Sequence, residues 1–159
     1  MFINKLKDIE GENNMGILLK KVTKENWYDC SCLEVFKEQE DIVAPNWNSI
    51  ISSFLWENWN TKCIYEDDKL IGFMMYGLDE DTKRVILVRY MIDIEYEGKG
   101  LGKKAIYKLF DLIKIEYGDV KFYVSVSATN IPAQKLYESV GFKKSVERMW
   151  DDDLMEIQL

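Results

Sequence analysis

The sequence predicts an α/β fold of the mixed α+β kind, in which helices flank a mostly antiparallel sheet. Residues 61–93 contain three consecutive apolar stretches joined by short polar links, and helical spacing returns on both sides of this block. A further alternating stretch, 119–128, is separated from the block by one helix. The expected order is β-α-α-β-β-β-α-β-α-β-β. With 159 residues, we expect a polar tail at 1–15 and one domain at 16–159.

The first part of the domain is predicted to be one strand and two helices. The stretch ILLKKV, residues 17–22, predicts a strand. Thr23 is the expected N-cap of a helix over residues 24–37, because its hydroxyl can accept hydrogen bonds from the free amides of a first turn. Asn46 is expected to cap a second helix. Its apolar residues recur at helical spacing and predict one buried stripe: Trp47, Ile50, Ile51, Phe54 and Leu55.

The middle of the chain predicts an antiparallel meander followed by a helix. Residues 61–67, 69–79 and 83–93 form the three strands, and the third is apolar enough to be covered on both faces. Helical spacing then runs from Gly100 to about Gly118, with one stripe formed by Ile106, Leu109, Phe110 and Ile113.

The last part of the chain predicts a strand, a helix and a hairpin. Residues 119–128 alternate between apolar and polar side chains, and a helix follows over 130–140, where Pro132 is tolerated in the first turn. Residues 141–150 and 154–159 complete a hairpin around a polar turn. The only parallel connection expected is the one between 83–93 and 119–128.

Composition narrows the range of partners. The net charge is −7, and no run of Lys and Arg is interleaved with aromatic residues, so nucleic acid and anionic membrane are disfavoured and a cationic partner is favoured. No apolar run approaches the roughly 20 residues of a membrane span. The first 16 residues lack the apolar core of a secretory signal. We therefore expect a cytoplasmic protein.

Two residue types limit the possible chemistry. Cys30, Cys32 and Cys63 are an odd number without a CxxC pair, which predicts reduced, buried thiols. The chain contains no histidine. Histidine triads, histidine bases and nearly every common zinc site are thereby excluded, and we expect no metal.

The segment EYEGKGLGKKAI, residues 95–106, predicts an anion site. Glycine is favoured where the backbone needs a positive φ or where a ligand packs against the main chain. A glycine-rich turn that opens a helix presents free amides and about half a positive charge from the helix dipole. The spacing fits neither a dinucleotide fingerprint nor a P-loop. The site is completed by Lys99, Lys103 and Lys104, and a polyphosphate is the expected ligand.

Two motifs together identify a family resemblance. YEGKGLG at 96–102 and N-x-x-A-x-x-LYE-x-x-GF at 130–142 resemble the two main motifs of the GCN5-related N-acetyltransferase (GNAT) superfamily, and the resemblance extends over residues 17–159. RYMID-x-x-YEGKGLG and IGFMMYG are similar to bacterial diamine and spermine/spermidine acetyltransferases. The resemblance implies acetyl-CoA as co-substrate, a small cationic amine as acceptor, and a homodimer.

The resemblance also implies roles for individual residues. Tyr137 would be the general acid, and Asn130 would hold the coenzyme. The alternatives for these two are a core aromatic residue and a simple N-cap. Glu97 departs from the family, which usually has Gln or Arg there. The coenzyme would be bound by the main chain at Met91, Ile92 and Asp93, by the turn Gly98, Lys99, Gly100, Leu101, Gly102 and Lys103, and by Asn130, Lys135 and Tyr137.

The acceptor amine needs carboxylates, because it arrives as an ammonium ion and the chain has no histidine to take its proton. Glu40 and Asp41 are the preferred substrate-binding residues, chosen from a pool that also includes Glu38, Asp79 and Asp93. Two other interpretations remain open. The acceptor is another amine, such as an aminoglycoside, an amino acid or a protein terminus, or the chain is a coenzyme-binding module without turnover.

Overall fold

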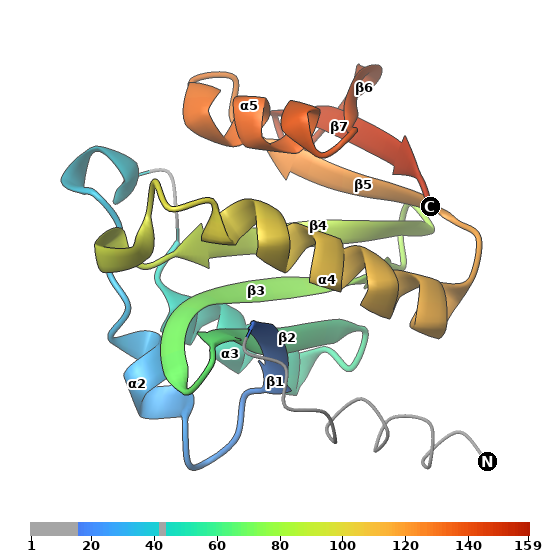
Figure 1. Cartoon of the computed structure of the whole chain (residues 1–159). Helices are drawn as coiled ribbons and strands as arrows, with labels where there is room; N and C mark the ends of the chain where they lie inside the picture. Colours follow the sequence, from blue (N-terminus) through green and yellow to red (C-terminus); the bar gives the residue numbers. More distant parts are fainter. Residues whose placement is uncertain (1–15, 42–43) are drawn as a thin grey trace.

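The computed structural model describes residues 16–41 and 44–159, and the expected tail at 1–15 lies outside them. The predicted order of strands and helices is confirmed (Figure 1). The elements are β1 (Ile17–Lys21), α2 (Trp27–Ser31), α3 (Asn46–Leu55), β2 (Trp59–Glu66), β3 (Lys69–Asp79), β4 (Arg84–Ile92), α4 (Leu101–Tyr117), β5 (Lys121–Val126), α5 (Ile131–Ser139), β6 (Lys143–Met149) and β7 (Asp152–Gln158).

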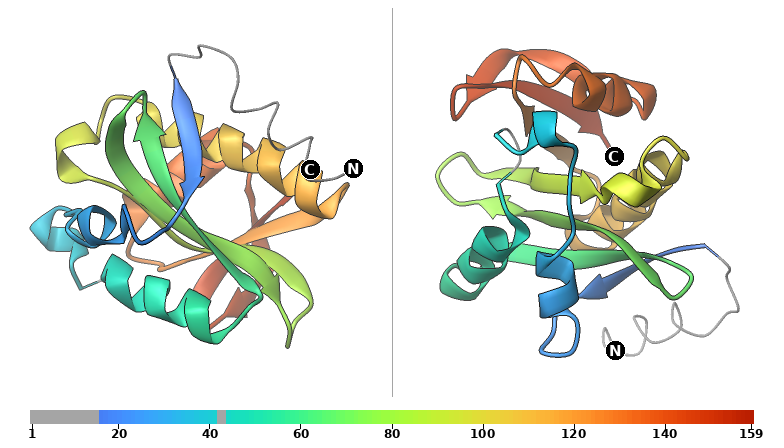
Figure 2. Two further views of the ribbon diagram at one scale, coloured as in Figure 1. Left: turned by 90° about the horizontal axis from the view of Figure 1, so that it is seen from below. Right: turned by 90° about the vertical axis from the view of Figure 1, so that its left-hand side faces the viewer.

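The strands form one mixed sheet in the order β1-β2-β3-β4-β5-β7-β6. As predicted, β4 and β5 pair in parallel through α4, whereas the other neighbouring strands are antiparallel. Helices α3 and α4 lie on opposite faces of the sheet (Figure 2). Within the described residues, no helix is both long and apolar enough to cross a membrane.

Helix α4 buries the stripe that its sequence predicts. Ile106, Leu109 and Ile113 are fully buried against the sheet, together with Phe122 of β5. Apolar burial stabilises by about 25 cal/mol per Å², so this row is a main source of stability on its side of the sheet.

The predicted helix over 24–37 is wrong in its length, since α2 spans only Trp27–Ser31. The Thr23 hydroxyl accepts from the Glu25 amide in a preceding turn, and Asn26 takes the N-cap position. Beyond the helix, the Asp93 carboxylate accepts from the Glu34 amide at 3.0 Å, which ties this segment to the end of β4. A tertiary hydrogen bond therefore overrides the local helical preference.

The burial of the three cysteine thiols is predicted correctly for two of them. Cys30 and Cys63 are buried free thiols, as predicted. Cys32 is exposed, which contradicts the prediction, because α2 ends one residue before it and its side chain does not reach the core.

The predicted burial of the α3 stripe is also wrong. Asn46 is the first helical residue rather than the cap, and its amide donates to the Cys30 carbonyl at 2.8 Å, where it is buried. Asn46, Ser49 and Ile50 face the sheet, so the buried face is rotated by about 100°, one residue, from the apolar stripe. Of the predicted stripe only Ile50 is buried; the others are exposed: Trp47, Ile51, Phe54 and Leu55.

Candidate active site

The site is built where β4 and β5 separate. Their pairing extends only from Val85 to Leu87 on β4, and beyond it the two strands diverge (Figure 1). At the same level β4 contains a bulge, because Arg89 pairs with Met75 and Leu87 with Tyr76, leaving Val88 without a partner on β3. Bulges re-aim the strand and are common beside active sites. A cavity of about 850 Å³ opens there, and we call it the main cavity.

The glycine turn forms one wall of the main cavity. Gly98 and Gly100 have φ of 74° and 76°, and nothing lies within 4 Å of the position of a side chain at either residue. These two glycines are thus required by backbone conformation. Gly102 is favoured by close approach, since an added Cβ would lie 3.1 Å from the Tyr90 hydroxyl and would press on it.

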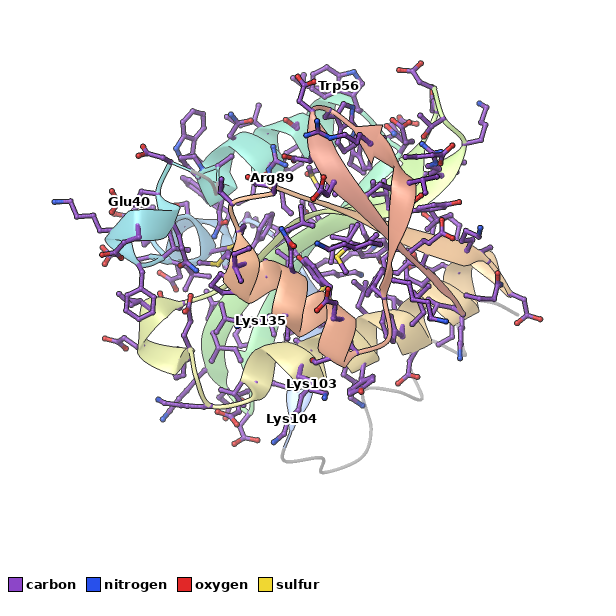
Figure 3. All side chains as sticks on the ribbon, turned by 90° about the horizontal axis from the view of Figure 1, so that it is seen from above. Glu40, Trp56, Arg89, Lys103, Lys104 and Lys135 are labelled. Carbon is purple, nitrogen blue, oxygen red and sulfur yellow. The ribbon has the colours of Figure 1, made fainter. Side chains whose placement is uncertain are left out.

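The turn leaves the first amides of α4 free. Gly100 is the N-cap and has no side chain to occupy them. These amides and the helix dipole form a site of positive potential beside the cavity. Lys103 lines the cavity, whereas the Lys99 ammonium donates to the Glu95 carbonyl at 2.8 Å and lies over the Tyr96 ring. Lys103 and Lys104 are seen at this end of α4 in Figure 3.

Glu97 brings a negative charge to the same wall. It lines the main cavity close to Gly98. Partial burial raises the pKa of the Glu97 carboxyl, and the nearby Asp93 carboxylate raises it further. The departure from the family pattern therefore lies inside the predicted anion site, where an anionic ligand would meet a carboxylate.

Two phenols lie deeper in the main cavity. The rings of Tyr90 and Tyr137 are 6.5 Å apart. The Tyr90 hydroxyl donates to the Gly102 carbonyl at 2.6 Å, so its proton is engaged with the backbone. Tyr137 is buried, and its hydroxyl makes no hydrogen bond within the described part of the chain. Burial raises the pKa of Tyr137 well above its ordinary value, which keeps this phenol protonated and available as a donor.

Asn130 and Gln134 fix the end of β5 to α5. The Asn130 side chain accepts from the Ala133 amide at 3.2 Å, so the simple N-cap role is present, and Asn130 also lines the cavity. The buried Gln134 amide donates to the carbonyls of Ser127 and Ala128, both at 3.1 Å. Sequence reasoning missed Gln134, which holds the α5 residues, including Tyr137, against the strand.

The structure brings most of the predicted coenzyme residues together. Asp93 is engaged elsewhere, because its amide donates to the Ile71 carbonyl and its carboxylate accepts from the backbone amides of Glu34 and Glu95. Leu101, the first residue of α4, is buried, and Lys135 is exposed on α5 (Figure 3). Those that line the main cavity are Met91, Ile92, Gly98, Gly100, Gly102, Lys103, Asn130 and Tyr137.

Of the two preferred substrate-binding carboxylates, only one lies at the main cavity. Asp41 lines the main cavity. Glu40 does not, and Figure 3 shows it at the outer edge of the molecule. Asp79 accepts from the amide and hydroxyl of Thr82 in the β3–β4 turn.

Arg89, Ser125 and Asp152 are three of the cavity residues that were not predicted. The Arg89 guanidinium donates to the Val88 carbonyl at 2.7 Å. The Asp152 carboxylate of β7 lies near this guanidinium and accepts from the Ser125 hydroxyl at 3.5 Å. Asp152 was assigned to a polar turn, but it belongs to β7 and pairs with Met149. The turn consists only of Trp150 and Asp151, and this length follows from the pairing of β6 with β7 rather than from the local sequence.

The comparisons with known proteins identify the family of this chain. Residues 24–142 match the acetyltransferase (GNAT) family, so the chain belongs to that family. It is 34% identical over 135 residues to a spermine/spermidine N(1)-acetyltransferase of Bacillus subtilis strain 168, covering 81% of this chain and 89% of that protein. A probable spermine N(1)-acetyltransferase of B. subtilis subsp. natto gives the same values.

Solved structures confirm the fold. A PaiA N-acetyltransferase of Thermoplasma acidophilum in complex with coenzyme A superimposes with a TM-score of 0.67 at 18% identity, covering 91% of this chain and all of that one. A spermidine N-acetyltransferase of Vibrio cholerae in complex with CoA and spermine gives a TM-score of 0.65 at 19% identity, covering 91% and 96%. The mixed sheet is thus the GNAT fold.

Proposed function

We propose that the protein transfers the acetyl group of acetyl-CoA to a primary amine of a diamine or polyamine such as spermidine or spermine. The observation that carries the proposal is the main cavity, in which free helix amides and an unengaged Tyr137 phenol face the same space. The similarity to spermine/spermidine acetyltransferases supports the polyamine, as does the net charge of −7.

The main cavity fits coenzyme A. The pyrophosphate would accept hydrogen bonds from the amides of the turn between Gly98 and Lys103, which the positive φ of Gly98 and Gly100 keeps open. The pantetheine arm would lie along β4 at Met91 and Ile92, beyond the end of its pairing with β5. This arrangement would bring the sulfur toward Tyr137.

The reaction joins the amine nitrogen to the acetyl carbon and breaks the carbon–sulfur bond. Tyr137 would donate its proton to the departing thiolate, for which a phenol with a raised pKa is in the required state. A backbone amide between Val88 and Met91, where β4 no longer pairs with β5, would polarise the acetyl carbonyl. Asn130 would position the coenzyme. One ammonium proton would leave to a carboxylate or through water before the attack, and the second proton that the nitrogen loses as the amide forms would restore the Tyr137 phenol. Asp41 remains the preferred carboxylate, with Glu40 beside it in sequence.

An assay of acetyl-CoA consumption tests the proposal. Spermidine, spermine, putrescine, an aminoglycoside and a peptide panel are offered to the purified chain, and the acetylated product is identified by mass spectrometry. We expect turnover with the polyamines. Turnover with another amine alone would favour the second acceptor class. Tight CoA binding without any turnover would identify a binding module, the alternative that Glu97 supports.

The protein is also proposed to form a homodimer. The exposed apolar side chains of α3 form a surface of the kind that marks interactions: Trp47, Ile51, Phe54 and Leu55. The sequence of α3 contains no charged residue, so two copies of this face can pack together without like-charge repulsion. Sedimentation at micromolar concentration should show a dimer that Phe54→Asp dissociates. A monomer, or a dimer indifferent to this change, would refute this surface.

A further inference from the structure

A second hollow of about 480 Å³ adjoins the main cavity. We call it the side hollow. It lies between the end of α3, the β3–β4 turn and the β6–β7 turn, and it shares Val88 and Arg89 with the main cavity. Figure 3 labels Trp56 and Arg89, two of its residues. The side hollow therefore begins at the Val88 bulge, where the proposed reaction takes place, and it extends away from the glycine turn that would bind the coenzyme.

Its walls are aromatic. Trp56, Trp59 and Trp150 all line it. Trp150 has a φ of 53° in the two-residue β6–β7 turn, a conformation that is rare for a bulky side chain. Such a residue persists where its surroundings or its function require it. Indole is also the aromatic group that attracts cations most strongly.

Its charge is negative. Asp79, Glu80 and Asp81 line the side hollow against one guanidinium, that of Arg89. Asp79 is held by Thr82, but Glu80 and Asp81 are exposed and take part in no ion pair within residues 16–41 and 44–159. Arg89 is itself directed to the Val88 carbonyl and faced by Asp152. The hollow thus offers carboxylates and indoles to a cation.

The strand register gives the distance between the bulge at Val88 and the carboxylates of the side hollow. Val85 pairs with Leu78, one residue before the acidic turn, and lies three residues from Val88. At about 3.3 Å per residue, the carboxylates are about 10 Å or more from the bulge. A linear triamine or tetramine can bridge this distance, whereas a monoamine cannot.

We propose that the side hollow binds the remote ammonium groups of a linear polyamine whose reacting amine lies in the main cavity. This inference rests on the proposed function, and it names the part of the molecule that selects long polyamines. Glu80 and Asp81 attract the remote charges, and the indole of Trp150 covers the alkyl chain. Asp79 holds the turn.

The test compares spermine with butylamine, which has no second ammonium. In Glu80→Gln/Asp81→Asn, the ratio of kcat/KM for spermine over butylamine should fall by about tenfold, because each exposed ammonium–carboxylate contact contributes modestly. The fall should appear in KM for spermine. Trp150→Leu should lower the same ratio without changing the charge.

The matched control is Asp67→Asn/Asp68→Asn in the β2–β3 turn, at the opposite end of β3. It removes the same charge from a similar turn and should leave the ratio unchanged. An equal fall of the spermine-to-butylamine ratio in both double variants would mean a general effect of net charge and would overturn the inference.

A binding measurement separates this inference from the proposed function. Calorimetry titrates spermine into the protein with CoA present. Weaker binding by Glu80→Gln/Asp81→Asn than by the control supports the side hollow, even if no amine is acetylated. If the wild-type chain acetylates spermine and both double variants have the same spermine-to-butylamine ratio, polyamine binding by the side hollow is refuted. The proposed function is then still supported.

Discussion

Helices α3 and α4 cover opposite faces of one sheet, and each has a clear apolar stripe in its sequence, yet only α4 buries that stripe. The α4 stripe packs against strands whose inward side chains are also apolar. In α3, the buried Asn46 hydrogen bond and the small residue Ser49 turn the helix by about one residue, leaving Phe54 exposed. Periodicity thus predicts that a helix forms, whereas the partner decides which side is buried.

The largest effect is expected on the α4 face. Leu109→Ala removes a fully buried side chain from a packed row, and the free energy of unfolding should fall by about 2–5 kcal/mol. Urea unfolding measures it, with the exposed neighbour Lys108→Ala as control. A loss below about 1 kcal/mol would mean that this face is less tightly packed than the structure shows.

The same side of the molecule carries the proposed acid. Tyr137→Phe should lower turnover by roughly tenfold to a thousandfold while CoA binding stays nearly intact, because only the donated proton is lost. Tyr90→Phe is the contrast. It removes the hydrogen bond to Gly102 at the glycine turn and should weaken CoA binding more. Unchanged turnover in Tyr137→Phe would remove Tyr137 as the acid.

A smaller effect is expected at the anion site. Glu97→Gln removes a carboxylate from the cavity wall and should tighten CoA binding by about fivefold at pH 7, since repulsion at short range is roughly 1 kcal/mol. Glu95→Gln is the matched control in the same turn.

The pH dependence of CoA binding follows from Glu97. The pKa of its carboxyl is raised, so its charge is lost as the pH falls through that raised value, and wild-type affinity should increase there. Glu97→Gln should lack this increase. Parallel pH profiles for wild type and variant, measured by calorimetry, would show that Glu97 does not face the phosphates.

The smallest effect returns to α3. Phe54→Ala should change the stability of the monomer by less than about 0.5 kcal/mol, because its side chain is 79% exposed. Thermal unfolding at low protein concentration measures this, and a concentration-dependent loss would instead report the proposed dimer. A large loss at every concentration would mean that the α3 stripe is buried within one chain.

Several parts of the site could be predicted from sequence because they depend on local backbone chemistry. Gly98 and Gly100 are needed for a positive φ, and Asn130 caps the helix that follows it. Asp152 and Arg89 could not be predicted in the same way. Their positions depend on the strand register and on the bulge at Val88, which no single stretch of sequence specifies.

The sequence by itself determined the order of the strands and helices, the glycine turn before α4 and the family, because each depends on spacing along one segment. Only the tertiary structure decided where β4 and β5 separate, which phenol is unengaged, and where α2 ends. These features arise from contacts between distant segments, such as Asp93 with Glu34 and Tyr90 with Gly102. Hydrogen bonds and packing between such segments compete with local preference, and the outcome depends on the whole fold.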